Sequence, residues 1–145
     1  MLFKRLNRTA AETVFAVFQA NEANIAADDV VALEVTAASV DGVKIAQPAT
    51  ANLFATVGVA DAAIANGAYG LVQIYGNRST SRVLATGTSL TAGLTALAPV
   101  AAQDYLSSGA TVPLAYLPAF VLLASVSSAP GANSTFSSRI FIRCM

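Results

Sequence analysis

Histidine and tryptophan are absent from this chain, and cysteine occurs once among its 145 residues. Without histidine, the Ser-His-Asp and Cys-His nucleophilic systems, the commonest general base and zinc or iron sites with histidine ligands are excluded. The single cysteine, Cys144, can form neither an internal disulfide nor a four-cysteine metal site, and we expect it to be an inert thiol. Only paired-carboxylate chemistry or an oxygen-ligated metal remains open.

Charged residues are also scarce, at 11% of the chain against roughly 25% in a typical soluble domain. The eight basic and eight acidic residues cancel, and most of the basic ones are scattered. A nucleic-acid-binding surface needs a concentrated basic patch, so we expect no nucleic-acid partner. Two interpretations of the low charge stay open: small residues such as alanine cover much of the surface, or other chains cover part of it permanently.

No stretch of the sequence has the pattern of a secretion signal or a membrane span. The basic start is followed by a polar segment that contains Glu12, where a secretion signal would have an apolar region. The most apolar stretch, residues 114–126, is too short to cross a bilayer and contains Pro118. We therefore expect no membrane partner and a protein that is made and assembled inside a cell.

The acidic residues offer little catalytic geometry. The closest pair is Asp28-Asp29, just before the apolar Val30-Val31. Neighbouring residues on a strand point to opposite faces, so these two carboxylates would not converge on one substrate. We interpret the pair as a polar turn that leads into a strand, and we expect no catalytic residue, no cofactor and no metal.

Alternating apolar residues and glycine turns predict an all-β fold, a single small barrel or sandwich of short strands. The Asp41-Gly42 turn predicts a hairpin over residues 30–46. A helical turn is expected within residues 99–108, and a helix over residues 60–65 is possible because alanine favours helices. The expected strands are residues 13–20, 30–37, 43–46, 54–60, 70–76, 82–86, 119–127 and 138–144, with a long hairpin joining the last two around a loop at 128–134.

The strand expected at residues 13–20 is apolar on both faces: Val14, Ala16 and Phe18 alternate with Phe15 and Val17. Such a strand is either central in a sheet or covered by a partner.

Residues 1–12 form a separate unit, an extended arm or short helix before the β-rich domain of residues 13–145. The arm carries Phe3, Lys4, Arg5 and Arg8. These basic residues fit either a solvated, flexible end or an arm that reaches onto an acidic neighbour, and both interpretations stay open.

Three segments carry a family resemblance: residues 54–60 (FATVGVA), residues 66–76 (NGAYGLVQIYG) and residues 87–97 (GTSLTAGLTAL). Together they resemble the small decoration, or cement, proteins of tailed-phage capsids, over about residues 28–106. The arm and the last 35 or so residues lie outside the match. The resemblance implies a structural protein on the outer surface of the capsid, assembled in the host cytoplasm, often as a trimer, that braces neighbouring major capsid subunits.

On this basis we expect a non-enzymatic virion protein that forms a homo-oligomer, with a trimer favoured. The expected contact residues are Phe3, Lys4, Arg5 and Arg8 in the arm and Tyr69 and Tyr75 near the glycine bends, since tyrosine and arginine are favoured at interfaces. Packing inside the sheet is the alternative role of each tyrosine. Three alternative functions remain: another virion subunit, such as a tail-tube, head-completion or fibre-base protein; a small β-sandwich that binds sugar or peptide; and a carboxylate-only enzyme.

Overall fold

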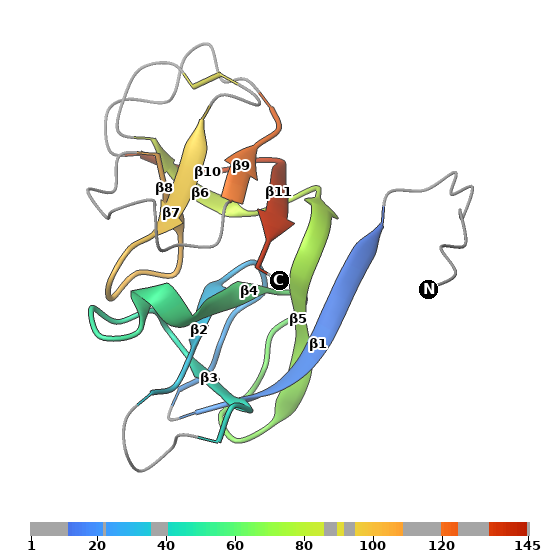
Figure 1. Cartoon of the computed structure of the whole chain (residues 1–145), viewed down its shortest axis with the longest axis vertical. Helices are drawn as coiled ribbons and strands as arrows, with labels where there is room; N and C mark the ends of the chain where they lie inside the picture. Colours follow the sequence, from blue (N-terminus) through green and yellow to red (C-terminus); the bar gives the residue numbers. More distant parts are fainter. Residues whose placement is uncertain are drawn as a thin grey trace, which may run out of the picture.

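A computed structural model describes residues 12–21, 23–35, 41–85, 90, 91, 95–108, 120–124 and 134–144. Within these ranges the chain forms eleven strands and one short 3-10 turn, η1, so the predicted all-β class is confirmed (Figure 1). The elements are β1 Thr13–Ala20, β2 Val30–Leu33, β3 Lys44–Ala46, η1 Leu53–Ala55, β4 Thr56–Ala60, β5 Tyr69–Arg78, β6 Arg82–Ala85, β7 Ala96–Pro99, β8 Leu106–Ser107, β9 Phe120–Leu122, β10 Ser134–Ser137 and β11 Ile140–Arg143.

The first five strands close into a barrel in the order β1-β3-β2-β4-β5, with β5 pairing back onto β1. The longest ladder is antiparallel and joins residues 13–19 of β1 to residues 69–76 of β5. On its other side, within the described part of the chain, β1 pairs in parallel with β3 only through Gln19 and Ala20. The barrel is therefore closed near the end of β1, while most of that strand is paired on one side.

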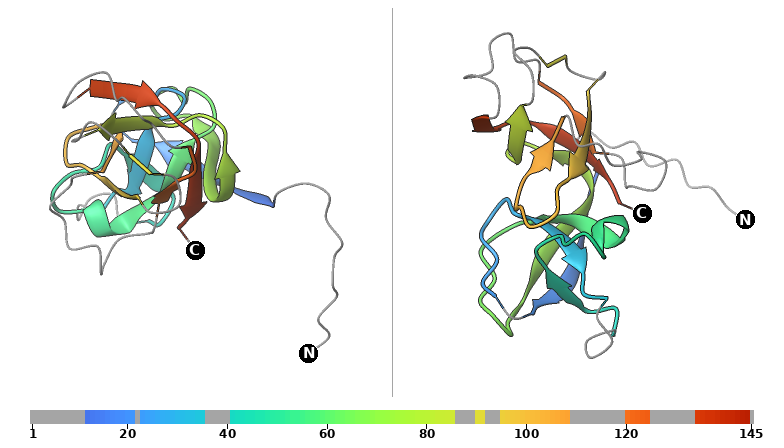
Figure 2. Two further views of the ribbon diagram at one scale, coloured as in Figure 1. Left: turned by 90° about the horizontal axis from the view of Figure 1, so that it is seen from above. Right: turned by 90° about the vertical axis from the view of Figure 1, so that its left-hand side faces the viewer.

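The remaining strands extend from the barrel through β5. Its last residues, 75–78, pair with β11, and the order continues β11-β9-β7-β8-β6-β10. Figure 2 shows this second half stacked on the barrel in the side view. The long strand β5 thus belongs to both halves and connects them.

Two hydrophobic cores follow from this arrangement. The barrel interior is filled by Ala20, Ile25, Val31, Ile45, Ala60, Ile64 and Val72. The second core contains Val30, Val59, Val83, Ala85, Leu90, Leu97, Leu106, Phe120, Leu122, Ile140 and Ile142. Strands β2 and β4 contribute alternate residues to the two cores, which is why both of their faces are apolar.

The hairpin predicted over residues 30–46 is confirmed, because β2 and β3 pair antiparallel. Gly42 takes a positive φ of +71°, as the turn requires. The Asp41 carboxylate accepts hydrogen bonds from the N–H groups of Val43 and Lys44, at 2.9 and 3.0 Å. These bonds stabilise the charged carboxylate and lower the pKa of Asp41.

Other local predictions were wrong. Residues 99–108 do not hold a helical turn, because they contain the end of β7 and the whole of β8, which pair with each other and with neighbouring strands. The alternative of a helix over residues 60–65 is not formed, since Ile64 makes an antiparallel bridge with Ile25. In both places, pairing with distant segments overrides the local preference of alanine for helix.

The antiparallel pairing expected between residues 119–127 and 138–144 is present in the β9–β11 ladder. It is not a simple hairpin, because β10 intervenes and pairs with β6. Of the proposed arm, residues 1–11 lie outside the described residues, and with them Phe3, Lys4, Arg5 and Arg8.

Candidate functional site

The outer surface of the β1–β5 ladder carries a row of exposed apolar side chains. Phe15 and Val17 are 41% and 59% exposed, and Tyr69 and Leu71 are 65% and 48% exposed. The register places Val17 directly opposite Leu71, so these side chains share one face of the sheet. We call the residues Phe15, Val17, Gln19, Tyr69 and Leu71 the β1–β5 face; none of them is charged.

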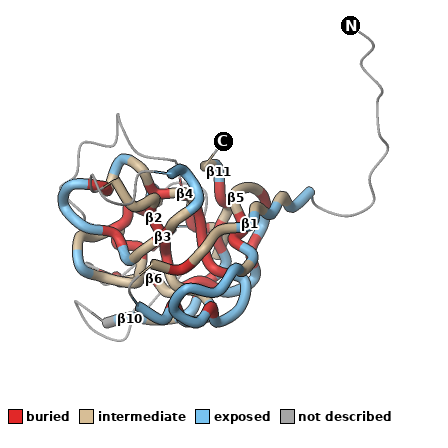
Figure 3. The backbone as a smooth tube through the Cα atoms, turned by 90° about the horizontal axis from the view of Figure 1, so that it is seen from below, coloured by how far each residue is buried: buried red, intermediate tan, exposed pale blue. Residues whose placement is uncertain are grey.

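This concentration of apolar surface is unusual. Six large apolar residues in the described ranges are exposed, and four of them belong to the β1–β5 face; the other two are Val43 and Phe54. Figure 3 shows exposed and half-buried residues along most of β1, while buried residues gather inside the barrel. Scattered exposed apolar residues are ordinary, whereas a group of them on one face is typical of contact surfaces, so the β1–β5 face is the candidate site.

A polar hollow borders the face beside Phe15. It has a volume of about 340 Å³. Its wall consists of Thr13, Phe15, Asp28, Asp61, Gln73, Asn77, Arg78, Ser79 and Thr80.

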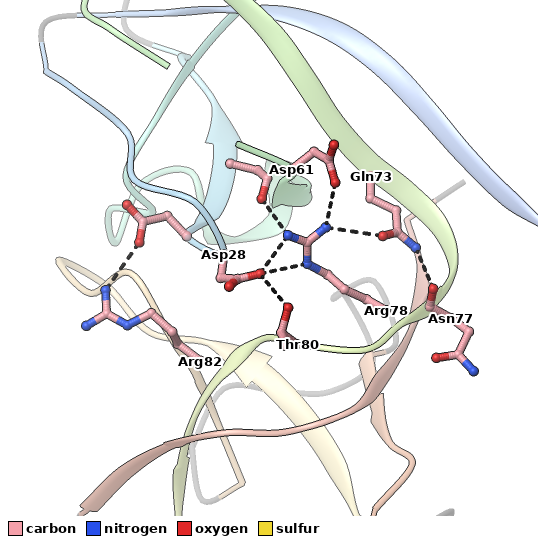
Figure 4. A network of polar contacts seen from close by, with 9 residues as sticks. Asp28, Asp61, Gln73, Asn77, Arg78, Thr80 and Arg82 are labelled. Carbon is pink, nitrogen blue, oxygen red and sulfur yellow. Dashed lines mark hydrogen bonds and ion pairs between the residues drawn. The ribbon is translucent and has the colours of Figure 1, made fainter. Parts of the chain in front are cut away.

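Arg78 organises the floor of this hollow (Figure 4). Its side chain is 8% exposed and lies 2.6 Å from the Asp28 carboxylate, measured from Nη2 to Oδ1. Arg78 Nη1 lies 3.3 Å from both Asp61 Oδ1 and Gln73 Oε1, and Nη2 donates to the Ala60 carbonyl at 2.9 Å. Because the guanidinium is surrounded by acceptors, it joins β5 to the turns at residues 28 and 61.

A second arginine makes a parallel connection. Arg82 Nη1 lies 3.3 Å from Asp29 Oδ1 and also contacts Asp104 Oδ2. Burial raises the pKa of Asp29, and the nearby Asp104 carboxylate adds to this effect, while hydrogen bonds from Ala26 and Arg82 oppose it. Arg82 therefore ties the start of β6 to the turn before β2 and to the segment before β8.

The predicted polar turn at Asp28-Asp29 is confirmed by these contacts. Asp28 has a positive φ of +69°, and its carboxylate points to Arg78, while that of Asp29 points to Arg82. The two acids do not converge on a common ligand. They stabilise the junction between the two halves of the molecule.

A further hollow of about 360 Å³ lies beside the turn before β2. Asn21, Asn24, Asp29, Gln47 and Asp104 line it together with apolar residues, and both acids contact Arg82. Across the described ranges, no three acidic or cysteine side chains gather as metal ligands would. Nor does any described helix have the length and apolar character needed to span a membrane.

The two predicted tyrosines lie in different surroundings. Tyr69 belongs to the β1–β5 face. Tyr75 is half-buried, and its ring packs edge-to-face on Phe141, with 5.4 Å between ring centroids and 78° between planes. Tyr75 thus packs between β5 and β11, and the structure does not bring the two tyrosines into one patch.

Sequence reasoning named Tyr69 but not Phe15, Val17 or Leu71 as contact residues. The sequence did contain a pattern that involves Phe15 and Val17, because the strand at residues 13–20 is apolar on both faces. That pattern left two alternatives, a central position in the sheet and a face covered by a partner. The register between β1 and β5, which the sequence does not encode locally, places Val17 beside Leu71 on the outer face.

Cys144 packs against the second core, and burial raises the pKa of its thiol to about 12. At neutral pH almost no thiolate forms. The predicted inertness of this thiol agrees with its position.

Comparison with family models, curated proteins and solved structures gave no match to this chain. Functional interpretation therefore depends on the residues and their geometry.

Proposed function

We propose that this chain is a non-enzymatic structural protein of a phage particle. In this proposal it binds between major capsid subunits on the outer surface of the capsid and stabilises the shell. The observation that carries the proposal is the β1–β5 face, an uncharged and largely apolar surface on two paired strands. Such a surface fits permanent contact with another protein.

The polar contacts around the face fit a mechanical role. Arg78 and Arg82 fasten both ends of the segment that joins β5 to β6, using the acids at positions 28, 29, 61 and 104. These carboxylates hold arginines within the fold, and this use fits a stiffening role better than proton transfer to a substrate. A stiff body loses little conformational freedom when it binds, which favours affinity.

Multivalency would add to the strength with which the protein binds the capsid. Many copies distributed over a shell reinforce one another, so each contact can be modest. The resemblance of residues 28–106 to capsid decoration proteins supports this proposal, and so does the low charge of the chain. Self-association into a homo-oligomer is part of it, because an apolar face also suits contact between copies.

The test uses particles of the phage whose genome encodes this chain. Particles are separated on a density gradient, and an antibody against the protein locates it. We expect the protein to sediment with DNA-filled heads. Sedimentation with isolated tails would instead support a tail-tube or related subunit. Absence from every particle fraction would contradict a virion role and favour a cellular binding module.

A rebinding experiment connects this result to the face. Heads stripped of the protein are mixed with wild-type protein, with Leu71→Lys or with Phe54→Lys. Leu71 lies in the β1–β5 face, whereas Phe54 lies in η1 and is exposed to a comparable degree, 63%. We expect Leu71→Lys to lose most binding and Phe54→Lys to retain it. Equal binding by both variants would contradict the role of the face.

A further inference from the structure

Among the residues that the structure describes, nothing pairs with one edge of β1 over most of its length. One side of the strand pairs with β5 along residues 13–19, but the other side meets β3 only at Gln19 and Ala20. In the described part of the chain, no strand pairs with residues 13–18 on that second side. Figure 1 shows β1 as the outermost strand of the barrel there.

The direction of the backbone groups follows from the neighbouring hydrogen bonds. Gln19 N–H donates to the Val43 carbonyl on the β3 side, at 3.0 Å, and Ala20 N–H donates to the Ala68 carbonyl on the β5 side, also at 3.0 Å. Backbone groups alternate in direction along an antiparallel strand. Phe15 and Val17 therefore point their N–H and C=O groups toward the unpaired edge.

This edge lacks the usual protection. Sheet edges are normally shielded by lysine, proline or inward-pointing charges, which prevent pairing with another chain. From Thr13 to Gln19 the sequence is TVFAVFQ, with no charge and no proline. The edge is suited to accept an added strand.

We propose that the edge of β1 pairs antiparallel with β1 of a second copy of this chain. In the register centred on Ala16, Phe15 of each copy lies opposite the partner's Val17. Aromatic and β-branched residues form favourable cross-strand pairs. The two β1–β5 faces then join into one continuous apolar surface, twice as wide as the face of a single copy.

The charged residues at the two ends of the β1 edge also favour antiparallel pairing with a second copy of the chain. Glu12 precedes one end, and Lys44 lies beside Gln19 at the other end. Antiparallel pairing carries Glu12 of each copy toward the partner's Lys44, which also lies 3.6 Å from Asp41 Oδ2 of its own copy. Parallel pairing would instead bring like ends together.

This inference rests on the self-association included in the proposed function, but not on capsid binding. The contact has two-fold symmetry, so its product is a dimer. The trimer implied by the family resemblance would need a different, head-to-tail contact.

The first measurement is the mass of the full chain by light scattering, from dilute to concentrated protein. We expect a rise toward twice 14.7 kDa with concentration. A monomer throughout would overturn the inference, as would a trimer whose mass does not respond to substitutions in β1. A protein that dimerises only after removal of residues 1–11 would also overturn it, because the chain's own N-terminus would then occupy the edge.

Substitutions at Phe15 and Val17 test the register. Phe15→Lys with Val17→Lys places like charges opposite each other in both cross-strand pairs, and should raise the dimer dissociation constant by at least about tenfold. Phe15→Glu with Val17→Lys places opposite charges there and should restore the dimer. The control Phe54→Lys should leave the mass unchanged. Circular dichroism confirms that each variant is folded. Equal dissociation constants for the two double variants would overturn the proposed register.

A monomeric protein that still binds stripped heads would overturn this inference and leave the proposed function standing. A dimer that binds no particle would do the reverse. The two experiments can therefore fail independently.

Discussion

The two halves of the molecule place their large apolar side chains differently. In the half that contains β6–β11, Leu97, Phe120 and Ile140 are fully buried in the second core. The barrel fills its interior with alanine, valine and isoleucine, and its outer surface carries Phe15 and Tyr69. All six exposed large apolar residues in the described ranges lie between positions 15 and 71.

Large apolar side chains therefore have different roles in the two halves: in one they stabilise the fold, and in the other they are exposed for contact. The second half uses its large side chains for packing, while the barrel presents some of its largest to the outside. Changes on the β1–β5 face should therefore alter association with little effect on folding. Changes in the second core should do the opposite.

Among the predicted changes in unfolding free energy, we expect the largest difference between alanine substitutions at Phe120 and at Phe15. Phe120→Ala leaves a cavity in the second core and should lower the free energy of unfolding by about 4 kcal/mol. Phe15→Ala removes a side chain that is 41% exposed and should cost about 1 kcal/mol or less. Urea denaturation measures both values. Similar losses of unfolding free energy for the two variants would contradict the different roles of the two halves.

The second-largest change in unfolding free energy is expected where β1 packs closely against β5. Gly76 has a φ of +105°, and an added Cβ would collide with the backbone of Glu12 and Thr13. Gly76→Ala should therefore push β1 away from β5 and lower the free energy of unfolding by about 3 kcal/mol.

The matched control is Gly67→Ala. Gly67 also has a positive φ, +74°, but nothing lies near its added Cβ. Only backbone strain applies, so the cost should be about 1 kcal/mol. Thermal unfolding of both proteins tests this, and equal costs would show that β1 is not held closely at Gly76.

The two arginines at the junction should differ by a smaller amount. Arg78→Met removes a buried guanidinium and leaves the Asp28 carboxylate and the Ala60 carbonyl without this donor, at a cost of about 2 kcal/mol. Arg82 is 43% exposed, so Arg82→Met should cost less than about 1 kcal/mol. Denaturant unfolding should rank them in this order; the reverse order would mean that Arg82 holds the two halves together.

The smallest effect is a pH dependence at Asp29. Burial raises the pKa of this carboxyl above its ordinary value of 3.8, so the native state holds the proton more tightly than the unfolded chain. The wild type should therefore lose stability relative to Asp29→Asn as the pH rises from below 3.8 through the raised pKa. Unfolding free energies of both proteins across this interval measure the difference. A gain of the wild type over the variant with rising pH would contradict the stated direction.

The sequence predicted parts of the fold that depend on local patterns. The strand at residues 13–20 was predicted with the observed bounds because a run of valine, phenylalanine and alanine is followed by a polar connection. The hairpin at residues 30–46 was predicted because Asp41-Gly42 is a strong turn. Strand β8 was not predicted, because Leu106 and Ser107 owe their conformation to pairing with β6 and β7.

The candidate site was less predictable for the same reason. Val17 and Leu71 become neighbours only through the β1–β5 register, 54 positions apart along the chain. The contacts of Arg78 with Asp28 and of Arg82 with Asp29 likewise join residues about 50 positions apart. No local pattern specifies such pairs, whereas tyrosine at position 69 could be named from residue type alone.

Amide hydrogen exchange at Phe15 and Val17 tests the central claim most directly. These two N–H groups point to the unpaired edge of β1, so they should exchange quickly in dilute protein. If the edge of β1 pairs with β1 of a second copy, their exchange should slow as the protein concentration rises, while the amide of Ala62, an exposed residue between β4 and β5, stays fast. Fast exchange of Phe15 and Val17 at every concentration would contradict the account.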